Sequence, residues 1–222
     1  MDLLLIVIPI VLVIASQAYI NSSYKRYSIY DIKSKMTGFD ATQKILESHN
    51  LSNKIKIKKI NGKLTDNFNP RTNVISLSND IYEDSSVASV AVAAHEVGHV
   101  LQHNEKYFFI VLRSILVPIV NFSSKIGYVI LMIGLLSSIL DIAFIGFIFM
   151  CVALLFQLVT LPTEFDASKR AAEELVKLGV VSSSELPQVK KMLRAAAYTY
   201  LASFFANILE MLRLFLIIRN DD

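Results

Sequence analysis

The chain has 222 residues, a length that suits one compact protein better than two independent soluble domains. Hydrophobic residues make up 54% of it and charged residues only 18%, against about 25% charged in an ordinary soluble domain. The single cysteine, Cys151, excludes an internal disulfide bond and a metal site built from cysteines. This composition indicates an integral membrane protein. The apolar residues are concentrated in four blocks, at 3–20, 126–140, 142–161 and 195–218.

The first apolar block, residues 3–20, is close to the roughly 20 apolar residues that cross the hydrocarbon core of a bilayer. A cleaved signal peptide is the alternative, since the small residues at 16–18 resemble a cleavage site. The segment begins with Asp2, however, and has no basic start. We therefore expect residues 1–20 to form an uncleaved N-terminal transmembrane anchor.

Basic residues follow this anchor directly, at Lys25, Arg26, Lys33 and Lys35. Because loops rich in lysine and arginine stay on the cytoplasmic side of a membrane, this cluster places residues 21–107 in the cytoplasm. The same cluster accounts for the sequence pI of about 8.9 without nucleic acid as a partner.

The second and third apolar blocks predict a transmembrane helical hairpin. Residues 142–161 contain no charge and are long enough to span, and residues 126–140 span if they are tilted. The last block contains Glu210 and Arg213, so it lies partly at the interface or faces other helices. Charges of this kind occur in channels and transporters, but a pair spaced i,i+3 is as readily explained as an interfacial ion pair.

A small α+β region lies between the anchor and the hairpin. Residues 37–50 have helical spacing, with Asp40 as the expected N-cap, and residues 54–60 alternate as a strand does. The sequence Asn-Gly-Lys at 61–63 predicts a hairpin turn, and residues 73–78 predict a second strand.

The connection 64–72 contains Pro70, which we expect to prevent regular strand pairing there. From residue 79 to 105 the pattern is helical, and Asp84 or Ser85 is the expected cap at its start.

This helix carries "HEVGH" at residues 95–99. Side chains four apart lie on one face of a helix, so His95 and His99 can present two imidazoles to one metal ion. Glu96 can then hold a water molecule and take its proton, as in the H-E-x-x-H arrangement of zinc peptidases. The alternative is a helix that carries histidines incidentally. Gly98 lowers the stability of a helix by about 1 kcal/mol relative to alanine. Its presence indicates either that another segment packs closely there or that the helix tolerates this loss for the sake of the site.

His103 follows His99 by four residues, with no glycine between them to break the helix. On a continuous helix it lies too far along the axis to share the metal ion. We therefore expect an outer supporting role or a helix-end role for His103, and not a ligand role.

The third ligand is sought among the carboxylates that follow. Glu105 lies at the end of the same helix and cannot fold back, and Asp141 lies at the far tip of the predicted hairpin. Residues after 163 return to the side of the histidines. Glu164 shares a helix face with small and apolar residues, whereas Asp166 shares a solvated face with Arg170. Glu164 is therefore favoured as the third ligand, and Asp166 remains the alternative.

Several segments together resemble a known family. They are "GKLTDNFNPRTNVISLSNDIY", "AAHEVGHVLQH", "LRSILVPIVNFSSKIG", "VTLPTEFDASKRAAEEL" and "LRAAAYTYLA". From about residue 20 to 205 the chain is similar to the YugP-type neutral zinc metallopeptidases of bacterial membranes, which are distantly similar to the HtpX-type proteases. The resemblance implies a membrane-embedded zinc peptidase with His95, His99 and Glu164 as ligands and Glu96 as the base.

The chain departs from the family at two places. The family loop reads closer to L-T-D-H-Y-D-P, whereas this chain has Asn67 and Asn69 in place of its histidine and second aspartate. The HtpX-type proteases carry an aspartate four residues after the ligand glutamate, where this chain has Ser168. Support for a ligand histidine must then come from Ser168, Asp166 or another residue.

The predicted fold class is a mainly α integral membrane protein, with a zincin-like α+β head that contains a short β-hairpin and is interrupted by the transmembrane hairpin. The expected parts are an anchor at 1–20, a head with the metal-binding helix at 21–107, an interfacial segment and transmembrane hairpin at 108–162, and a third-ligand helix with a C-terminal apolar helix at 163–222.

The predicted function is zinc-dependent endopeptidase action at a bacterial cell membrane, with one zinc ion per chain, Glu96 as general base and a protein or peptide substrate associated with the membrane. Tyr200 or Tyr198 could stabilise the oxyanion, although a tyrosine at a membrane interface is more often an anchor. The strand at 73–78 could receive an extended substrate, and a plain core strand is the alternative. The alternative from another class is a membrane scaffold that binds zinc without catalysis.

Overall fold

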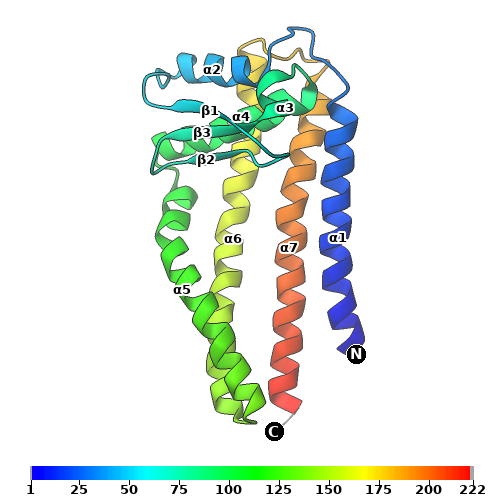
Figure 1. Ribbon diagram of the computed structural model, residues 1–222, viewed down its shortest axis with the longest axis vertical. Helices are drawn as coiled ribbons and strands as arrows, with labels where there is room; N and C mark the ends of the chain where they lie inside the picture. The colour runs from blue at the N-terminus through cyan, green and yellow to red at the C-terminus, as the bar shows by residue number, and fades with distance from the viewer. Residues whose placement is uncertain (1, 221–222) are drawn as a thin grey trace. The chain divides into compact units, whose positions relative to one another are not determined.

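Figure 1 presents the structure, a computed structural model that describes residues 2–220. Its backbone is mainly helical and divides into two compact units, each described here by itself. We call the first unit the head, and it comprises residues 18–107 and 163–197. We call the second the helical unit, and it comprises the described parts of 1–17, 108–162 and 198–222.

Four of the described helices are long and apolar enough to cross a membrane. They are α1 (Asp2–Tyr27), α5 (Phe108–Leu136), α6 (Leu140–Lys177) and α7 (Leu186–Asn220). The predicted blocks 3–20, 142–161 and 195–218 each lie within one of them, whereas the block 126–140 runs past the end of its helix at residue 136 and through the following turn. The last block therefore belongs to a helix of spanning length. Within it, Nε of Arg213 donates to Oε2 of Glu210 over 3.0 Å, so these two charges are paired with each other and give no sign of a charged pore.

Helices α5 and α6 form the predicted helical hairpin (Figure 1). The chain turns at residues 137–139, where Ser138 has a left-handed φ of 54°. Just before the turn, Gly134 packs directly on the backbone of Ala143, and a side chain there would overlap it. The two helices pack closely near the turn because glycine removes the side chain that would separate them.

Helix α6 differs from its prediction in length. The third-ligand helix was expected to be separate and to lie after residue 162, but α6 runs without a break from the apolar block to Lys177 and has 38 residues. Pro162 lies inside it without ending it, since a proline removes only one donor from the helix ladder and a membrane helix tolerates that loss. Glu164 is therefore carried by the same helix as the third apolar block.

The sheet of the head contains β1 (Lys56–Ile60), β2 (Asn67–Asn69) and β3 (Val74–Ser78) in the order β1-β3-β2. The prediction of a hairpin at 61–63 is wrong, because β1 pairs with β3 in parallel. The short hairpin is instead formed by β2 and β3, which pair antiparallel.

Strand β2 lies inside the connection for which regular pairing was excluded. The strand ends at Asn69, so Pro70 falls in the turn, where its missing N–H leaves no gap in the ladder. Oδ1 of Asn69 accepts from the backbone N–H of Arg71 over 2.9 Å and closes this turn.

Three helices pack on or beside the sheet, and their starts differ by a few residues from the predicted ones. Helix α2 (Gly38–Ser48) begins after Thr37, which forms a capping box with Asp40, so Asp40 is the third helical residue and not the cap. The predicted helix from 79 is broken into α3 (Asn79–Glu83) and α4 (Val87–Asn104). Ser86 caps α4, in place of Asp84 or Ser85.

Helix α4 lies in the core of the head and runs alongside the sheet (Figure 1). Its residues are small and apolar on almost every side, and Ala88, Val90, Ala94 and Val97 have no exposed surface. A helix that is apolar all round is buried all round. The face that carries His95 and His99 is the exception, since both histidines are partly exposed, so the two ligand candidates are held by a helix that is packed on its other sides.

Gly98 allows α4 and α6 to approach closely inside the head. A Cβ atom added at Gly98 would lie 2.5 Å from the backbone carbonyl oxygen of Ala167, one helical turn after Glu164. No real Cβ comes that close to a backbone atom, so a side chain here would push the two helices apart. The close packing of α4 and α6 therefore explains why a residue of low helix propensity stands at position 98.

We expect the Gly98→Ala substitution to destabilise the protein and to weaken its metal binding. Alanine favours the helix by about 1 kcal/mol relative to glycine, but overpacking against α6 costs about 1–3 kcal/mol. The added methyl group also pushes α4 and α6 apart, and these two helices carry the candidate ligands. Thermal unfolding in detergent and zinc content measure the two effects. Asn104→Ala, at the exposed end of α4, is the matched control and should change neither. An unchanged zinc content in Gly98→Ala would contradict this role.

Candidate metal centre

Two histidines of α4 and one glutamate of α6 converge in the head. Nε2 of His95 lies 3.2 Å from Oε2 of Glu164, and Nε2 of His99 lies 3.5 Å from the same oxygen. One ligand atom from each of the three side chains lies within 4.8 Å of the others. Among residues 2–220 this is the group of His, Cys, Asp and Glu side chains with the geometry of a metal site.

The spacing and chemistry of these atoms fit zinc. Metal–ligand bonds of about 2.0–2.2 Å in tetrahedral geometry separate neighbouring ligand atoms by about 3.3 Å, and the two measured separations lie on either side of that value. Two imidazole nitrogens and one carboxylate oxygen form a donor set that zinc prefers and that leaves a fourth position open. The side chain of Glu164 is only 3% exposed, so its charge needs the cationic partner that a metal ion provides.

The other nitrogen of each histidine ring is held by a neighbour. Ser168 of α6 places Oγ 3.2 Å from Nδ1 of His95, and Oε1 of Gln102 lies 3.0 Å from Nδ1 of His99. The amide oxygen of Gln102 can only accept, so Nδ1 of His99 carries the hydrogen and Nε2 is free to bind a metal ion. Such partners fix the tautomer and orientation of ligand histidines.

Gln102 is the site residue that the sequence analysis missed. Its side chain is fully buried, and its Nε2 donates to the backbone oxygen of Thr163 over 2.7 Å and to Oδ2 of Asp166 over 2.9 Å. It therefore connects His99 on α4 to both sides of Glu164 on α6. The signal was present in the i,i+3 spacing from His99, which places the amide on the same helix face.

Asp166 occupies an intermediate position between surface and site. Its predicted pair with Arg170 is present, with Nε to Oδ2 at 2.6 Å, and Arg170 also reaches Oε2 of Glu105 at 2.6 Å. The side chain of Asp166 is only 23% exposed and accepts from Gln102, so this end of the expected solvated strip is half-buried, whereas Glu173 further along it is exposed. Asp166 thus lies two hydrogen bonds from His99, outside the converging group.

Glu96 lies next to the first ligand candidate and is buried, with 8% of its surface exposed. Burial raises the pKa of Glu96 above the ordinary value for a glutamate, against the opposing influence of the nearby His95 and His99. Within the described residues Glu96 makes no hydrogen bond or ion pair. Its oxygens are not among the fully buried atoms that lack a partner, so the carboxylate keeps some accessible surface.

The remaining candidates lie outside the converging group. His103 is exposed near the end of α4, with its ring centroid 6.1 Å from that of Phe68 on β2. Tyr198 and Tyr200 lie on the part of α7 that belongs to the helical unit, and both are exposed. Their role as oxyanion donors stays a prediction.

The loop that departs from the family pattern is held by its polar side chains. Oδ1 of Asp66 accepts from the backbone N–H of Ser78 over 2.7 Å, which fastens the loop to the end of β3. Asn67 donates to the backbone oxygen of Thr65 over 2.9 Å. With Asn69 closing the β2–β3 turn, the two asparagines stabilise the local backbone.

Comparison with known proteins identifies the family of the chain. A family model described as "Putative neutral zinc metallopeptidase" matches residues 2–219. The chain belongs to this family. The protein named "Putative membrane protease YugP" of Bacillus subtilis (strain 168) is 37% identical over 205 residues, which cover 92% of this chain and 91% of that protein. No solved structure matches the chain.

Membership of the neutral zinc metallopeptidase family supports zinc as the metal for which His95, His99 and Glu164 are arranged. It also agrees with the four helices of spanning length, since the Bacillus relative is named as a membrane protein. The resemblance read from the sequence motifs is confirmed as far as the family is concerned.

We expect Glu164→Ala to lose zinc and Asp166→Ala to keep it with reduced affinity. The first substitution removes a candidate ligand atom, whereas the second removes a partner of Gln102, and loss of such outer partners costs about 10- to 100-fold in affinity. Competition with a chromophoric zinc chelator measures both affinities. His103→Ala, an exposed change on α4, is the control that should bind as the unchanged protein does. A larger loss in Asp166→Ala than in Glu164→Ala would reverse the assignment.

Proposed function

We propose that this protein is a membrane-bound endopeptidase that holds one zinc ion between His95, His99 and Glu164 and uses Glu96 as its general base. The main observation in support is that these three side chains converge beside a buried carboxylate, which has no hydrogen-bond partner among the described residues. The family and the name of the Bacillus relative support the same reaction class.

Zinc bound at this position would polarise the carbonyl group of the substrate and make a bound water molecule acidic enough to react near neutral pH. The chain's own residues would do the rest. Ser168 and Gln102 hold the imidazoles of His95 and His99 in one orientation. Glu96 takes a proton from the attacking water and passes it to the leaving amine, and the raised pKa of its carboxyl suits a group that must both accept and donate.

The burial of Glu96 also favours catalysis over a scaffold that binds zinc without reacting. A structural zinc site needs its ligands and their supporting partners, and it has no use for an additional buried carboxylate. Burial of an unpaired carboxyl costs stability, so a scaffold would gain from an apolar residue at this position. The protein keeps Glu96 in spite of this loss of stability, which supports a role of Glu96 in proton transfer.

For the substrate we propose an extended peptide that pairs with strand β2. The strand at 73–78 was one candidate receiver, but β3 is central in the sheet and is paired on both sides, as the alternative of a core strand predicted. Strand β2 is an edge strand within the described residues, and it contacts α4. An edge strand offers unpaired backbone groups to a peptide, which is then positioned independently of most of its side chains.

We propose further that the head faces the cytoplasm. Basic residues are frequent next to the membrane helices on its side, as at Lys25 and Arg26 at the end of α1 and at Lys169 and Arg170 after the apolar run of α6. The turn at 137–139 carries none. Such an asymmetry is the ordinary signal for a cytoplasmic segment.

The Glu96→Gln substitution tests the reaction. Glutamine keeps the size of the side chain and removes its basicity, so we expect zinc content to stay unchanged while cleavage falls by about 10²- to 10⁴-fold. Purified protein in detergent is assayed with a labelled unstructured protein such as casein, and metal is measured by elemental analysis.

Glu47→Gln on the exposed face of α2 is the matched control for this experiment and should cleave at the original rate. Full cleavage by Glu96→Gln would refute the role of Glu96 as base. A protein that binds zinc and cleaves nothing in either form would favour the scaffold.

The orientation is tested with single cysteines in a Cys151→Ser background. A cysteine at exposed Asn61 in the head should react with a membrane-impermeant maleimide only after the cells are permeabilised. A cysteine at exposed Ser137, in the turn between α5 and α6, should react in intact cells, because one span separates it from the head. The opposite labelling pattern would place the head outside.

A further inference from the structure

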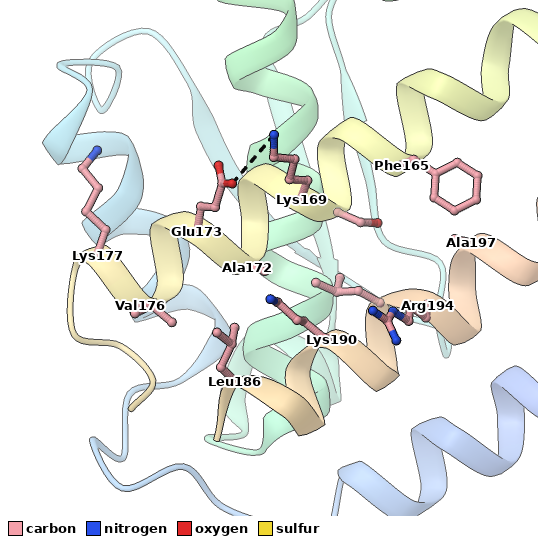
Figure 2. Close-up of a pocket in the computed structure, with 12 residues that line it drawn as sticks. Phe165, Lys169, Ala172, Glu173, Val176, Lys177, Leu186, Lys190, Arg194 and Ala197 are labelled. Atoms are coloured by element: carbon pink, nitrogen blue, oxygen red, sulfur yellow. Dashed lines mark ion pairs between the residues drawn. The ribbon is translucent and has the colours of Figure 1, made fainter. Parts of the chain in front are cut away.

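A cavity of about 660 Å³ lies in the head between the second part of α6 and the first part of α7 (Figure 2). Its volume is within the range of about 300–1,000 Å³ that is typical of small-molecule sites. Its wall is predominantly apolar, and the apolar side chains come from both helices: Phe165, Ala172, Val176, Leu186, Leu193 and Ala197. A cavity with such a wall takes the hydrocarbon part of a ligand.

The charged groups at this cavity are mainly cationic. Lys169 lies 4.0 Å from Glu173, and Lys177 lies 2.9 Å from Glu174, so these two cations have acidic neighbours on their own helix. Figure 2 shows the Lys169–Glu173 pair on α6, across the cavity from Lys190 on α7.

Lys190 and Arg194 are different, because neither makes an ion pair or hydrogen bond within residues 2–220. They are four residues apart on α7, and both line the cavity and are exposed. Like charges at this spacing repel each other and weaken the helix. An anion bound between them would remove that repulsion, so the two side chains form a site for a negatively charged group at the mouth of an apolar cavity.

Of the site residues, Ser168 lines the cavity, whereas the three candidate ligands do not. Oγ of Ser168 contacts Nδ1 of His95, and Nε2 of the same ring lies 3.2 Å from Oε2 of Glu164. Ser168 is therefore shared by the cavity wall and the surroundings of the candidate metal centre.

The sequence places this cavity close to the ends of two membrane helices. Phe165 follows the apolar block of α6 by four residues, and Arg194 directly precedes the apolar block of α7. Such positions lie near the interface of a bilayer, where an apolar chain and a phosphate are available together.

We propose that this cavity binds an anionic phospholipid, with its phosphate between Lys190 and Arg194 and an acyl chain along the apolar wall. The apolar wall and the two unpaired cations match the two parts of such a lipid. The proposal does not depend on the peptidase function, because binding is measured without cleavage.

Native mass spectrometry of the full-length protein in detergent tests the proposal. We expect phosphatidylglycerol to bind more tightly than phosphatidylcholine with the same acyl chains. Lys190→Gln combined with Arg194→Gln should weaken phosphatidylglycerol binding by about 30-fold, the loss expected for two basic contacts to an anionic headgroup. The charge-matched control, Lys191→Gln combined with Lys58→Gln, changes two exposed lysines outside the cavity and should bind within about twofold of the original protein.

A second variant tests the acyl part of the site. Val176→Phe narrows the apolar part of the cavity and leaves the charges unchanged, so it should also weaken phosphatidylglycerol binding. Inorganic phosphate should fail to displace the lipid from the original protein. Thermal unfolding of each variant verifies that the fold is intact. Equal binding of the two lipids, equal binding by the Lys190/Arg194 variant and its control, or displacement of the lipid by an acidic peptide would overturn the proposal.

Discussion

The close approach of α4 and α6 at Gly98 and Ala167 is the constraint on which the metal centre depends. Neither helix holds a metal site by itself, since α4 supplies two imidazoles and α6 supplies the carboxylate. The distance between those groups is determined by how near the two backbones come. Gln102 reinforces the contact, because one buried amide connects His99 to the backbone and side chain of α6 on either side of Glu164. Packing and hydrogen bonding thus act on the same few residues.

This arrangement places polar chemistry inside an apolar core. Around α4 nearly every buried neighbour is aliphatic, and the site groups are the exception. In such surroundings a hydrogen bond or charge pair is stronger than in water, and an unpaired group is more costly. His95, His99, Gln102 and Glu164 are therefore connected to one another. Glu96 stays unconnected, which is the arrangement expected of a group that works on a substrate.

Sequence patterns predicted the helices of the protein better than its sheet. The apolar blocks lie on α1, α5, α6 and α7, and the motif helix is α4. The strands at 54–60 and 73–78 exist, yet their pairing was wrong, because alternation shows that a segment is extended and not which neighbour it pairs with. Three-residue β2 was missed since it is too short to show a period. The helix caps at Thr37 and Ser86 differ from the predicted ones by one to three residues, because several polar side chains near each start could serve.

The sequence by itself predicted the candidate ligand pair and the candidate base beside it, since the i,i+4 spacing of His95 and His99 is a local property of any helix. It also selected Glu164 among the later carboxylates, because helix periodicity separates a face lined with small residues from a charged one. Only the tertiary structure decided which candidate partners hold the histidines, since Ser168 reaches His95 from 73 positions later in the chain. Gln102 is local to His99, but its amide is fixed by Thr163, 61 positions later. The same holds for the purpose of Gly98, whose neighbour is the backbone of a distant helix. Contacts between distant segments depend on how whole elements pack, and no local pattern records that.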